Sequence, residues 1–214
     1  MVILGILGSP RLNGKCSKLL QEVLNGAESH GAETSRINLI KYNIKHCMGC
    51  CQCMINDPEL HIGKCLLKDD MAMLLEQYVR ADGYVLASPV YDVSITALMK
   101  QFLERKMALT YRPEDAYATI GGPRNPWAFK KKAVMIVTGN CGDEYRELMG
   151  DPCFAMMEGQ FMIEQVETID KFYVGGVENM TEETFMKKLQ YAHRMGKTLA
   201  DRILAEGIKT KSFT

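Results

Sequence analysis

The sequence has no apolar run long enough to span a membrane and no excess of charge of either sign. None of its apolar stretches approaches the ~20 residues that a membrane helix needs, so we expect no membrane partner. The 26 basic residues are balanced by 26 acidic ones, which removes the electrostatic argument for a nucleic-acid partner. The apolar start, residues 2–9, has no basic segment before it, and we expect a cytoplasmic protein.

Internal repeats, low-complexity segments and a convincing second domain are also missing. A chain of 214 residues can bury a full core as one unit, and we predict a single domain over residues 1–214. Two long segments of this domain are predicted to lie outside its regular strands and helices, a cysteine-rich loop at about 43–68 and a long excursion at about 107–131. The lysine run at 130–132 is interpreted as a solvated strand entrance, and the methionine-rich stretch 153–162 as core or subunit interface.

Apolar segments of strand length alternate with helical patterns along the chain. Helices are expected from Lys15 to near Gly31, from Met71 after a cap at Asp69 or Asp70, over 95–106 after a cap at Ser94, and over 181–205. Such alternation predicts an α/β protein with three layers, in which helices cover both faces of a parallel sheet. Five strands fit the doubly wound order 2-1-3-4-5, and we place them at 2–9, 32–40, 83–91, 132–140 and 165–176.

In a sheet of this order, ligands bind beyond the carboxyl ends of strands 1 and 3, where the strand order reverses. The loop after the first strand, GSPRLNGKCS, leads into a helix N-terminus, where the dipole and free N–H groups favour a phosphate. It matches neither G-x-x-x-x-G-K-[ST] nor G-x-G-x-x-G, and an ordinary turn with a serine cap is the alternative. Its candidate ligands are the hydroxyls of Ser9 and Ser17, the guanidinium of Arg11 and the amide of Asn13.

The loops after the third and fourth strands lie at the same edge of the predicted sheet. Tyr91 can lie against a flat ring, and the backbone around Asp92 and Val93 can hydrogen-bond the polar edge of a heterocycle. Small residues in the next loop permit close backbone approach. Taken alone, each loop is also compatible with an ordinary turn. The candidate residues are Pro89, Val90, Tyr91, Asp92 and Val93 in the first of them, and Thr138, Gly139 and Asn140 in the second.

Three motifs resemble, in order, those of the flavodoxin-like NAD(P)H-dependent FMN reductases, and more narrowly the iron–sulfur flavoproteins. They are GSPRLNGKCSKLL, the run CMGCCQC…GKCLLKDDM, and ADGYVLASPVYDVSITALMKQFLER, and the similarity covers about residues 2–140. The resemblance implies a bound FMN whose ring rests against the loops at 89–93 and 138–140. It implies that the phosphate is held through Ser9, Arg11, Asn13, Cys16 and Ser17, although relatives usually have a hydroxyl residue in place of Cys16.

The cysteine-rich loop contains a C-x2-C-x2-C run formed by Cys47, Cys50 and Cys53, and Cys65 follows after eleven intervening residues. Four thiolates from one loop suit a [4Fe–4S] cluster. The iron–sulfur flavoproteins that the chain resembles have a much shorter gap before the fourth cysteine, and Cys51 adds a competing thiol. The alternatives are a zinc site that also uses His46 or His61, thiol–disulfide exchange beside the flavin, and small buried residues without chemistry.

The expected function is that of an FMN-dependent oxidoreductase, which takes electrons from NAD(P)H and passes them to a flavin, quinone or protein acceptor. The flavin carries the chemistry in such enzymes, so no catalytic side chain is expected. The alternative is an electron carrier that links FMN, a [4Fe–4S] cluster and a ferredoxin-like partner, and a third interpretation is a redox-sensing thiol protein. The resemblance also implies a homodimer or homotetramer, in which the excursion at 107–131 covers the flavin of a neighbouring subunit.

Overall fold

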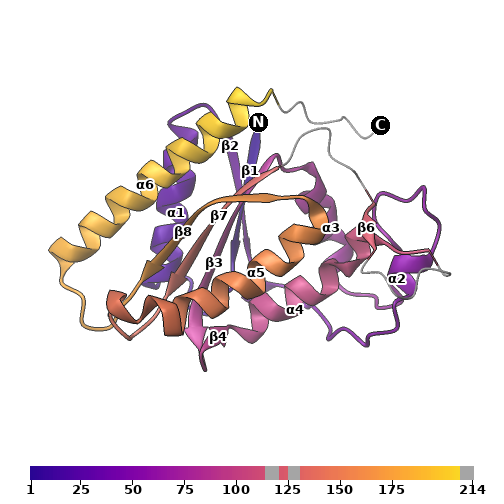
Figure 1. The fold of residues 1–214 in the computed structure, drawn as a ribbon, viewed down its shortest axis with the longest axis horizontal. Coiled ribbons are helices and arrows are strands. Elements are labelled where there is room, and N and C mark those ends of the chain that lie inside the picture. Colours follow the sequence, from indigo (N-terminus) through magenta and orange to yellow (C-terminus); the bar gives the residue numbers. More distant parts are fainter. Residues whose placement is uncertain (114–120, 125–130, 208–214) are drawn as a thin grey trace.

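The protein is a three-layer α/β structure, seen in a computed structural model that describes residues 1–113, 121–124 and 131–207 (Figure 1). Its five long strands are parallel and lie in the order β2-β1-β3-β7-β8, which confirms the predicted doubly wound order. The strands are β1 (Val2–Leu7), β2 (Glu33–Asn38), β3 (Gly83–Tyr91), β7 (Lys132–Thr138) and β8 (Glu167–Val174). A short strand, β4 (Ser94–Ile95), folds back antiparallel on the end of β3.

Two helices cover one face of the sheet and three cover the other. Alternate residues of each strand point to opposite faces, so Ile3 and Leu7 of β1 pack with one helix layer, and Leu4 and Ile6 pack with the other. The first layer holds α1 (Lys15–Glu28) and α6 (Glu182–Ala205). The second holds α3 (Met71–Arg80), α4 (Ala97–Arg105) and α5 (Asp151–Glu164).

The cysteine-rich segment lies outside this sandwich, at one edge of the molecule beside α4 (Figure 1). It is flanked by η1 (Leu39–Lys41), contains the one-turn helix α2 (Gln52–Ile55), and packs on η2 (Lys106–Leu109). The described part of the excursion forms the hairpin of β5 (Thr110–Tyr111) and β6 (Gly122–Pro123), which packs on the same segment. Two of its aromatic residues, Tyr117 and Trp127, lie outside the described residues.

The structure corrects two local expectations and supports part of a third. The methionine-rich stretch, interpreted as core or subunit interface, lies in a helix, α5, that the sequence patterns did not reveal, and Met157 belongs to the core. Thr96 caps α4 in place of Ser94, because Ser94 pairs with Tyr91 in the β3–β4 hairpin. Lys132 is buried rather than solvated at the start of β7, where its ammonium pairs with Glu167 and Glu206 from distant segments. Lys131 is buried too, and Lys130 lies outside the described residues.

Among the helices of the described ranges, none is long and apolar enough to cross a lipid bilayer. The N-terminal strand β1 lies inside the sheet, with β2 on one side and β3 on the other. Its carboxyl end therefore meets that of β3 at one edge of the sheet, the position from which ligand-binding loops of such folds project.

Candidate functional site

A cavity of about 350 Å³ opens at the carboxyl ends of β1, β3 and β7. It brings together eleven of the thirteen residues predicted to bind the cofactor, and the loops that carry them come from three separate parts of the sequence. Four further residues that the sequence patterns did not single out complete the lining, namely Lys15, Cys141, Met149 and Val177. The predicted residues in the lining are Ser9, Arg11, Cys16, Pro89, Val90, Tyr91, Asp92, Val93, Thr138, Gly139 and Asn140.

One end of the cavity is suited to a phosphate group. Helix α1 begins there with Gly14 as its N-cap, and no side chain caps its first turn, so the positive end of the helix dipole and its N–H groups face the cavity without a protein anion. The Ser9 hydroxyl accepts the N–H of Arg11 at 3.1 Å and keeps its own hydrogen free to donate. Lys15 donates to the carbonyl of Val177 and lines the same end.

Two of the predicted phosphate ligands do not reach the cavity. The Ser17 hydroxyl is buried beneath α1, where it donates to the carbonyl of Leu12 and accepts from Nη2 of Arg36 at 2.5 Å. Its hydrogen is therefore used to hold the loop together rather than offered to a ligand. Asn13 is exposed on the loop and is absent from the cavity lining.

Cys16 lies in the lining at the start of α1, where it is almost fully buried. Burial raises the pKa of its thiol to about 12, against the smaller lowering effects of Thr138 and Arg36. A thiol with this pKa is neutral at physiological pH, and it therefore adds no negative charge beside the phosphate end. A cysteine is compatible with anion binding at this position even though it replaces a better hydrogen-bond donor.

The other end of the cavity is formed by the β3–β4 hairpin, whose two turn residues both adopt left-handed backbone conformations. Asp92 has a φ of 50° and Val93 a φ of 58°, as a two-residue type I′ turn requires. This conformation is unfavourable for a β-branched residue, and backbone strain of this kind concentrates at ligand sites. Tyr91, about half-exposed beside the turn, also lines this cavity.

The loops after β7 and β8 are joined by backbone hydrogen bonds, which explains the residues that the sequence patterns missed. The N–H of Val177 donates to the carbonyl of Gly139 at 3.1 Å, and that of Gly176 donates to Cys141 at 2.8 Å. These bonds bring Val177 into the cavity although β8 is two strands away from β3. No sequence motif signals this approach, because it depends on the register between the last two strands.

A second, smaller cavity of about 100 Å³ lies in the cysteine-rich segment. All four predicted metal ligands, Cys47, Cys50, Cys53 and Cys65, line it together with Cys51, so the long gap does not keep the fourth thiol away. The remaining walls are mostly apolar and include Met48, Met54, Leu66, Leu67 and Met107. Burial raises the pKa of Cys53 to about 11, and the neighbouring thiols of Cys65, Cys47 and Cys50 add to the rise.

Arg105, at the end of α4, ties the two ends of this segment together. Its Nη1 donates to the carbonyl of Lys45 at 2.8 Å and pairs with Asp69 at 2.5 Å, and its Nη2 donates to the Sγ of Cys65 at 3.5 Å. Burial alone would raise the pKa of Asp69, but hydrogen bonds from Arg105 and from the N–H groups of Lys45 and Met71 outweigh it and lower that pKa. The ion pair is almost fully buried.

A single metal ion and an iron–sulfur cluster make different demands on the spacing of the thiols in this pocket. Across the described ranges, no three His, Cys, Asp or Glu side chains are placed to hold one ion. Four thiolates on one zinc ion stand about 3.8 Å apart, as follows from Zn–S bonds of about 2.3 Å in a tetrahedron. A [4Fe–4S] cluster binds each thiolate through a different iron and so holds the sulfurs farther apart. His61 is not part of the pocket lining, and its Nε2 lies 3.4 Å from a carboxylate oxygen of Glu76.

The doubly wound sheet, the phosphate-suited helix N-terminus and the aromatic hairpin at the switch point define a flavodoxin-like, flavin-binding class of protein. The sequence matches the NADPH-dependent FMN reductase family over residues 1–150. The chain therefore belongs to this family, and it is a flavin-dependent oxidoreductase whose class uses FMN and a nicotinamide nucleotide.

Its relatives include proteins named iron–sulfur flavoprotein. One from Archaeoglobus fulgidus is 37% identical over 167 residues, which cover 67% of this chain and 73% of the relative. Another from the same organism is 28% identical over 100% of this chain and 98% of its own. Among solved structures, an NAD(P)H:quinone oxidoreductase from Methanothermobacter marburgensis has a TM-score of 0.71 at 16% identity, with 93% of this chain and 96% of that chain covered, and it shares the fold.

Proposed function

We propose that the protein binds FMN in the cavity at the ends of β1, β3 and β7, takes electrons from NADPH or NADH there, and passes them to a flavin, quinone or protein acceptor. The observation that carries this proposal is the convergence of the uncapped α1 N-terminus with Ser9 and Arg11 on one cavity. The chemistry that FMN supplies when bound is acceptance of a hydride and release of electrons to the acceptor.

The chain's own residues bind and orient the cofactor in this proposal. Ser9, Arg11 and the first N–H groups of α1 hold the phosphate, while the neutral Cys16 thiol packs beneath it. The backbone of the strained hairpin at Asp92 and Val93 faces the polar edge of the ring, and Tyr91 lies against it. Asn13 and Ser17 are not included in this set, because neither lines the cavity. Assembly as a homodimer or homotetramer stays a prediction.

The cysteine pocket supports a second candidate function, that of an electron carrier with both FMN and a [4Fe–4S] cluster. The four thiols at one apolar pocket are a fitting donor set, because soft thiolates are the usual ligands of such clusters. Helix α4 leads from Thr96, which donates to the Gly8 carbonyl at 2.6 Å near the flavin cavity, to Arg105 at the cysteine pocket. The nine residues of this helix span about 14 Å at ~1.5 Å per residue.

Anaerobic mixing of the FMN-loaded protein with NADPH or NADH tests the first candidate. We expect rapid loss of the oxidised flavin absorbance with at least one of the two nucleotides. Dithionite serves as the control, because it reduces any accessible flavin whether or not a nicotinamide site exists. If dithionite reduces the flavin and neither nucleotide does so, the reductase proposal is wrong. Iron and sulfide in stoichiometric amounts after anaerobic purification would then favour the electron carrier.

A further inference from the structure

The segment between Cys53 and Cys65 returns to its own starting point instead of extending away from it. An ideal Cβ atom on Gly63 would lie 1.8 Å from the carbonyl oxygen of Cys53, so only a glycine backbone fits this approach. The N–H of Gly63 also donates to the carbonyl of Ala108 at 2.7 Å. Gly63, two positions before Cys65, is thereby fixed against Cys53. The long gap in sequence between the third and fourth thiols is therefore not a long distance in space.

A single buried guanidinium, that of Arg124, holds the turn that makes this return possible. Its Nη1 donates to the carbonyls of Asp57 at 2.8 Å and Leu60 at 3.2 Å. Its Nη2 donates to the carbonyl of Cys53 at 3.0 Å, and also to those of Met54 and Asn56 and to the Asn56 side chain. This one side chain therefore binds carbonyls at the end of α2 and in the following turn, and it adds to the backbone N–H bonds that Met54 and Asp57 already accept.

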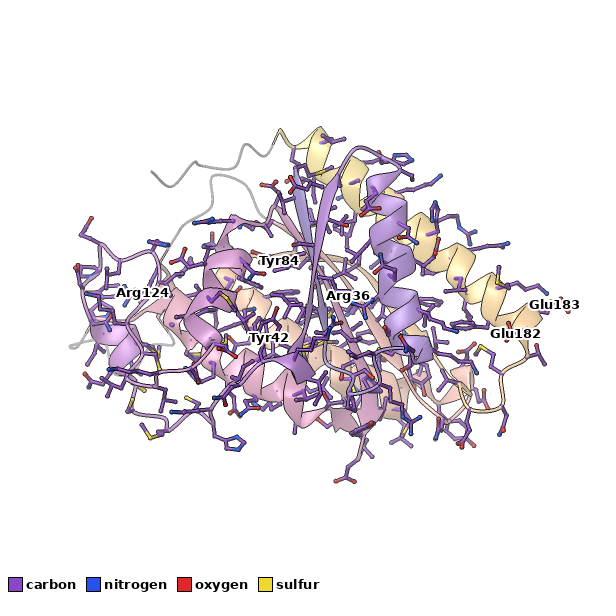
Figure 2. All side chains as sticks on the ribbon, turned by 180° about the vertical axis from the view of Figure 1, so that it is seen from behind. Arg36, Tyr42, Tyr84, Arg124, Glu182 and Glu183 are labelled. Carbon is purple, nitrogen blue, oxygen red and sulfur yellow. The ribbon has the colours of Figure 1, made fainter. Side chains whose placement is uncertain are left out.

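Arg124 is presented to the cysteine segment by the β5–β6 hairpin. Its own N–H donates to the carbonyl of Leu109 at 2.9 Å, and the N–H of Arg112 on the facing strand donates to Met54 at 3.0 Å. The guanidinium also lies 5.4 Å from the centre of the Tyr111 ring, a cation–π distance. Figure 2 shows Arg124 on the side of the molecule that carries α2, away from the sheet.

We propose that Arg124 is the positioning residue that makes the eleven-residue gap compatible with a four-thiolate site. This inference rests on the proposed cluster in the cysteine pocket. Arg124 does not line that pocket and touches none of its sulfurs, so it acts through the backbone around Cys53 and Gly63. A planar fork that reaches several carbonyls at once is required, and a lysine ammonium, which is a compact point charge, does not replace it.

Four variants separate the shape of Arg124 from its charge. Arg124→Met removes both, and Arg124→Lys keeps the charge. Gly63→Ala keeps the arginine but blocks the return, because its Cβ would lie 1.8 Å from the carbonyl oxygen of Cys53 and 2.9 Å from Nε of Arg124. Lys64→Met is the matched control, since it removes an exposed positive charge beside Cys65 without touching the turn. Each variant is purified with FMN and reconstituted anaerobically with iron and sulfide, and FMN, iron and sulfide per chain are measured.

We expect iron and sulfide per chain to fall at least fivefold in Arg124→Met, Arg124→Lys and Gly63→Ala, and to stay at the wild-type level in Lys64→Met. FMN per chain stays unchanged in all four, because the flavin cavity shares no residue with the turn. Wild-type iron and sulfide in Arg124→Met would overturn the assignment. Loss of FMN from Arg124→Met would overturn it too, since the damage would then extend beyond the cysteine segment.

A measurement on the metal-free protein distinguishes failure of this inference from failure of the proposed cluster. A short bis-maleimide is used to cross-link Cys65 to the cysteines of the C-x2-C-x2-C run, and the products are mapped by peptide mass spectrometry. We expect a yield that falls at least fivefold in Arg124→Met and is unchanged in Lys64→Met. If the wild type takes up no iron or sulfide, the cluster proposal fails, and the dependence of this yield on Arg124 still decides the positioning role. An equal yield in Arg124→Met and wild type contradicts it.

Discussion

Replacement of Asp69 by asparagine tests how strongly the buried Arg105–Asp69 ion pair supports the cysteine segment. Both side chains are almost fully buried, and Asp69 also accepts the N–H of Lys45 at 2.8 Å and that of Met71 at 3.0 Å. Removal of one partner of a buried ion pair leaves the other charge uncompensated and lowers the free energy of unfolding by about 3–5 kcal/mol. Since asparagine keeps one acceptor oxygen, we expect Asp69→Asn to lower the free energy of unfolding by about 3 kcal/mol, at the lower end of that range.

Urea denaturation of the metal-free protein at a fixed FMN concentration measures this loss. For a chain of this size it corresponds to a decrease in Tm of about 6–12 °C. The control is Asp70→Asn, because Asp70 accepts only the N–H of Asn43, at 2.8 Å, among the hydrogen bonds of its carboxylate found in the described residues, and about 1 kcal/mol is expected. A difference of less than about 1 kcal/mol between the two variants would refute the role given to the ion pair.

The pH dependence of the same experiment gives an independent check. The pKa of Asp69 is lower in the folded protein than in the unfolded chain, where it is about 3.9. The stabilisation is therefore complete above this unfolded value and is lost as the pH falls through the folded pKa. The difference in free energy of unfolding between wild type and Asp69→Asn should stay constant from neutral pH to about pH 5 and should decrease below about pH 4.

Two further predictions concern buried groups. Lys106→Met should destabilise the protein by about 3–5 kcal/mol in urea, because it removes the ammonium that lies 2.9 Å from the buried Glu164 carboxylate and leaves that charge with the neutral hydroxyl of Tyr78 as a hydrogen-bond donor. The double variant Lys106→Met/Glu164→Leu should recover most of that loss. If the double variant instead loses the sum of the losses of the two single variants, this prediction is wrong. Brief iodoacetamide treatment of the folded, metal-free protein at pH 8 should modify the exposed Cys47, Cys50 and Cys65 and spare Cys16 and Cys153, where burial raises the pKa to about 12 and about 11. Labelling of Cys16 at the rate of Cys47, followed by peptide mapping, would show that the α1 N-terminus is more open than described.

The sheet order and the loops of the flavin cavity follow from local sequence patterns. The strands β1, β3 and β7 are apolar runs that alternate with helical patterns, and the point at which the strand order reverses fixes which loops meet. Helix α5 was not predicted because its exposed faces also carry apolar residues, Met156 and Met162, so the apolar residues of the segment do not form a single stripe. The short strand β4 consists of two residues, which is too few for any period to show.

The support of the cysteine pocket was not predictable in the same way. Arg105 and Arg124 are ordinary basic residues in the sequence, and their partners are carbonyl groups, which every residue carries. The Arg124 bonds connect positions about 64–71 residues apart in sequence, so they become visible only when the hairpin is placed on the loop. The spacing of the cysteines indicated a candidate site, whereas its closure across the long gap is a property of the fold.

The central claim, that FMN is held by its phosphate at the α1 N-terminus, is tested most directly by comparing FMN with riboflavin, which lacks the phosphate. Flavin fluorescence titrations give Kd values for both ligands in wild type and in Ser9→Ala/Arg11→Ala. Two lost hydrogen bonds to a charged group amount to about 3 kcal/mol, or roughly 100-fold in Kd. We expect the variant to bind FMN about 100-fold more weakly and riboflavin as the wild type does. An unchanged Kd for FMN, or equal weakening of both ligands, would contradict the placement of the phosphate.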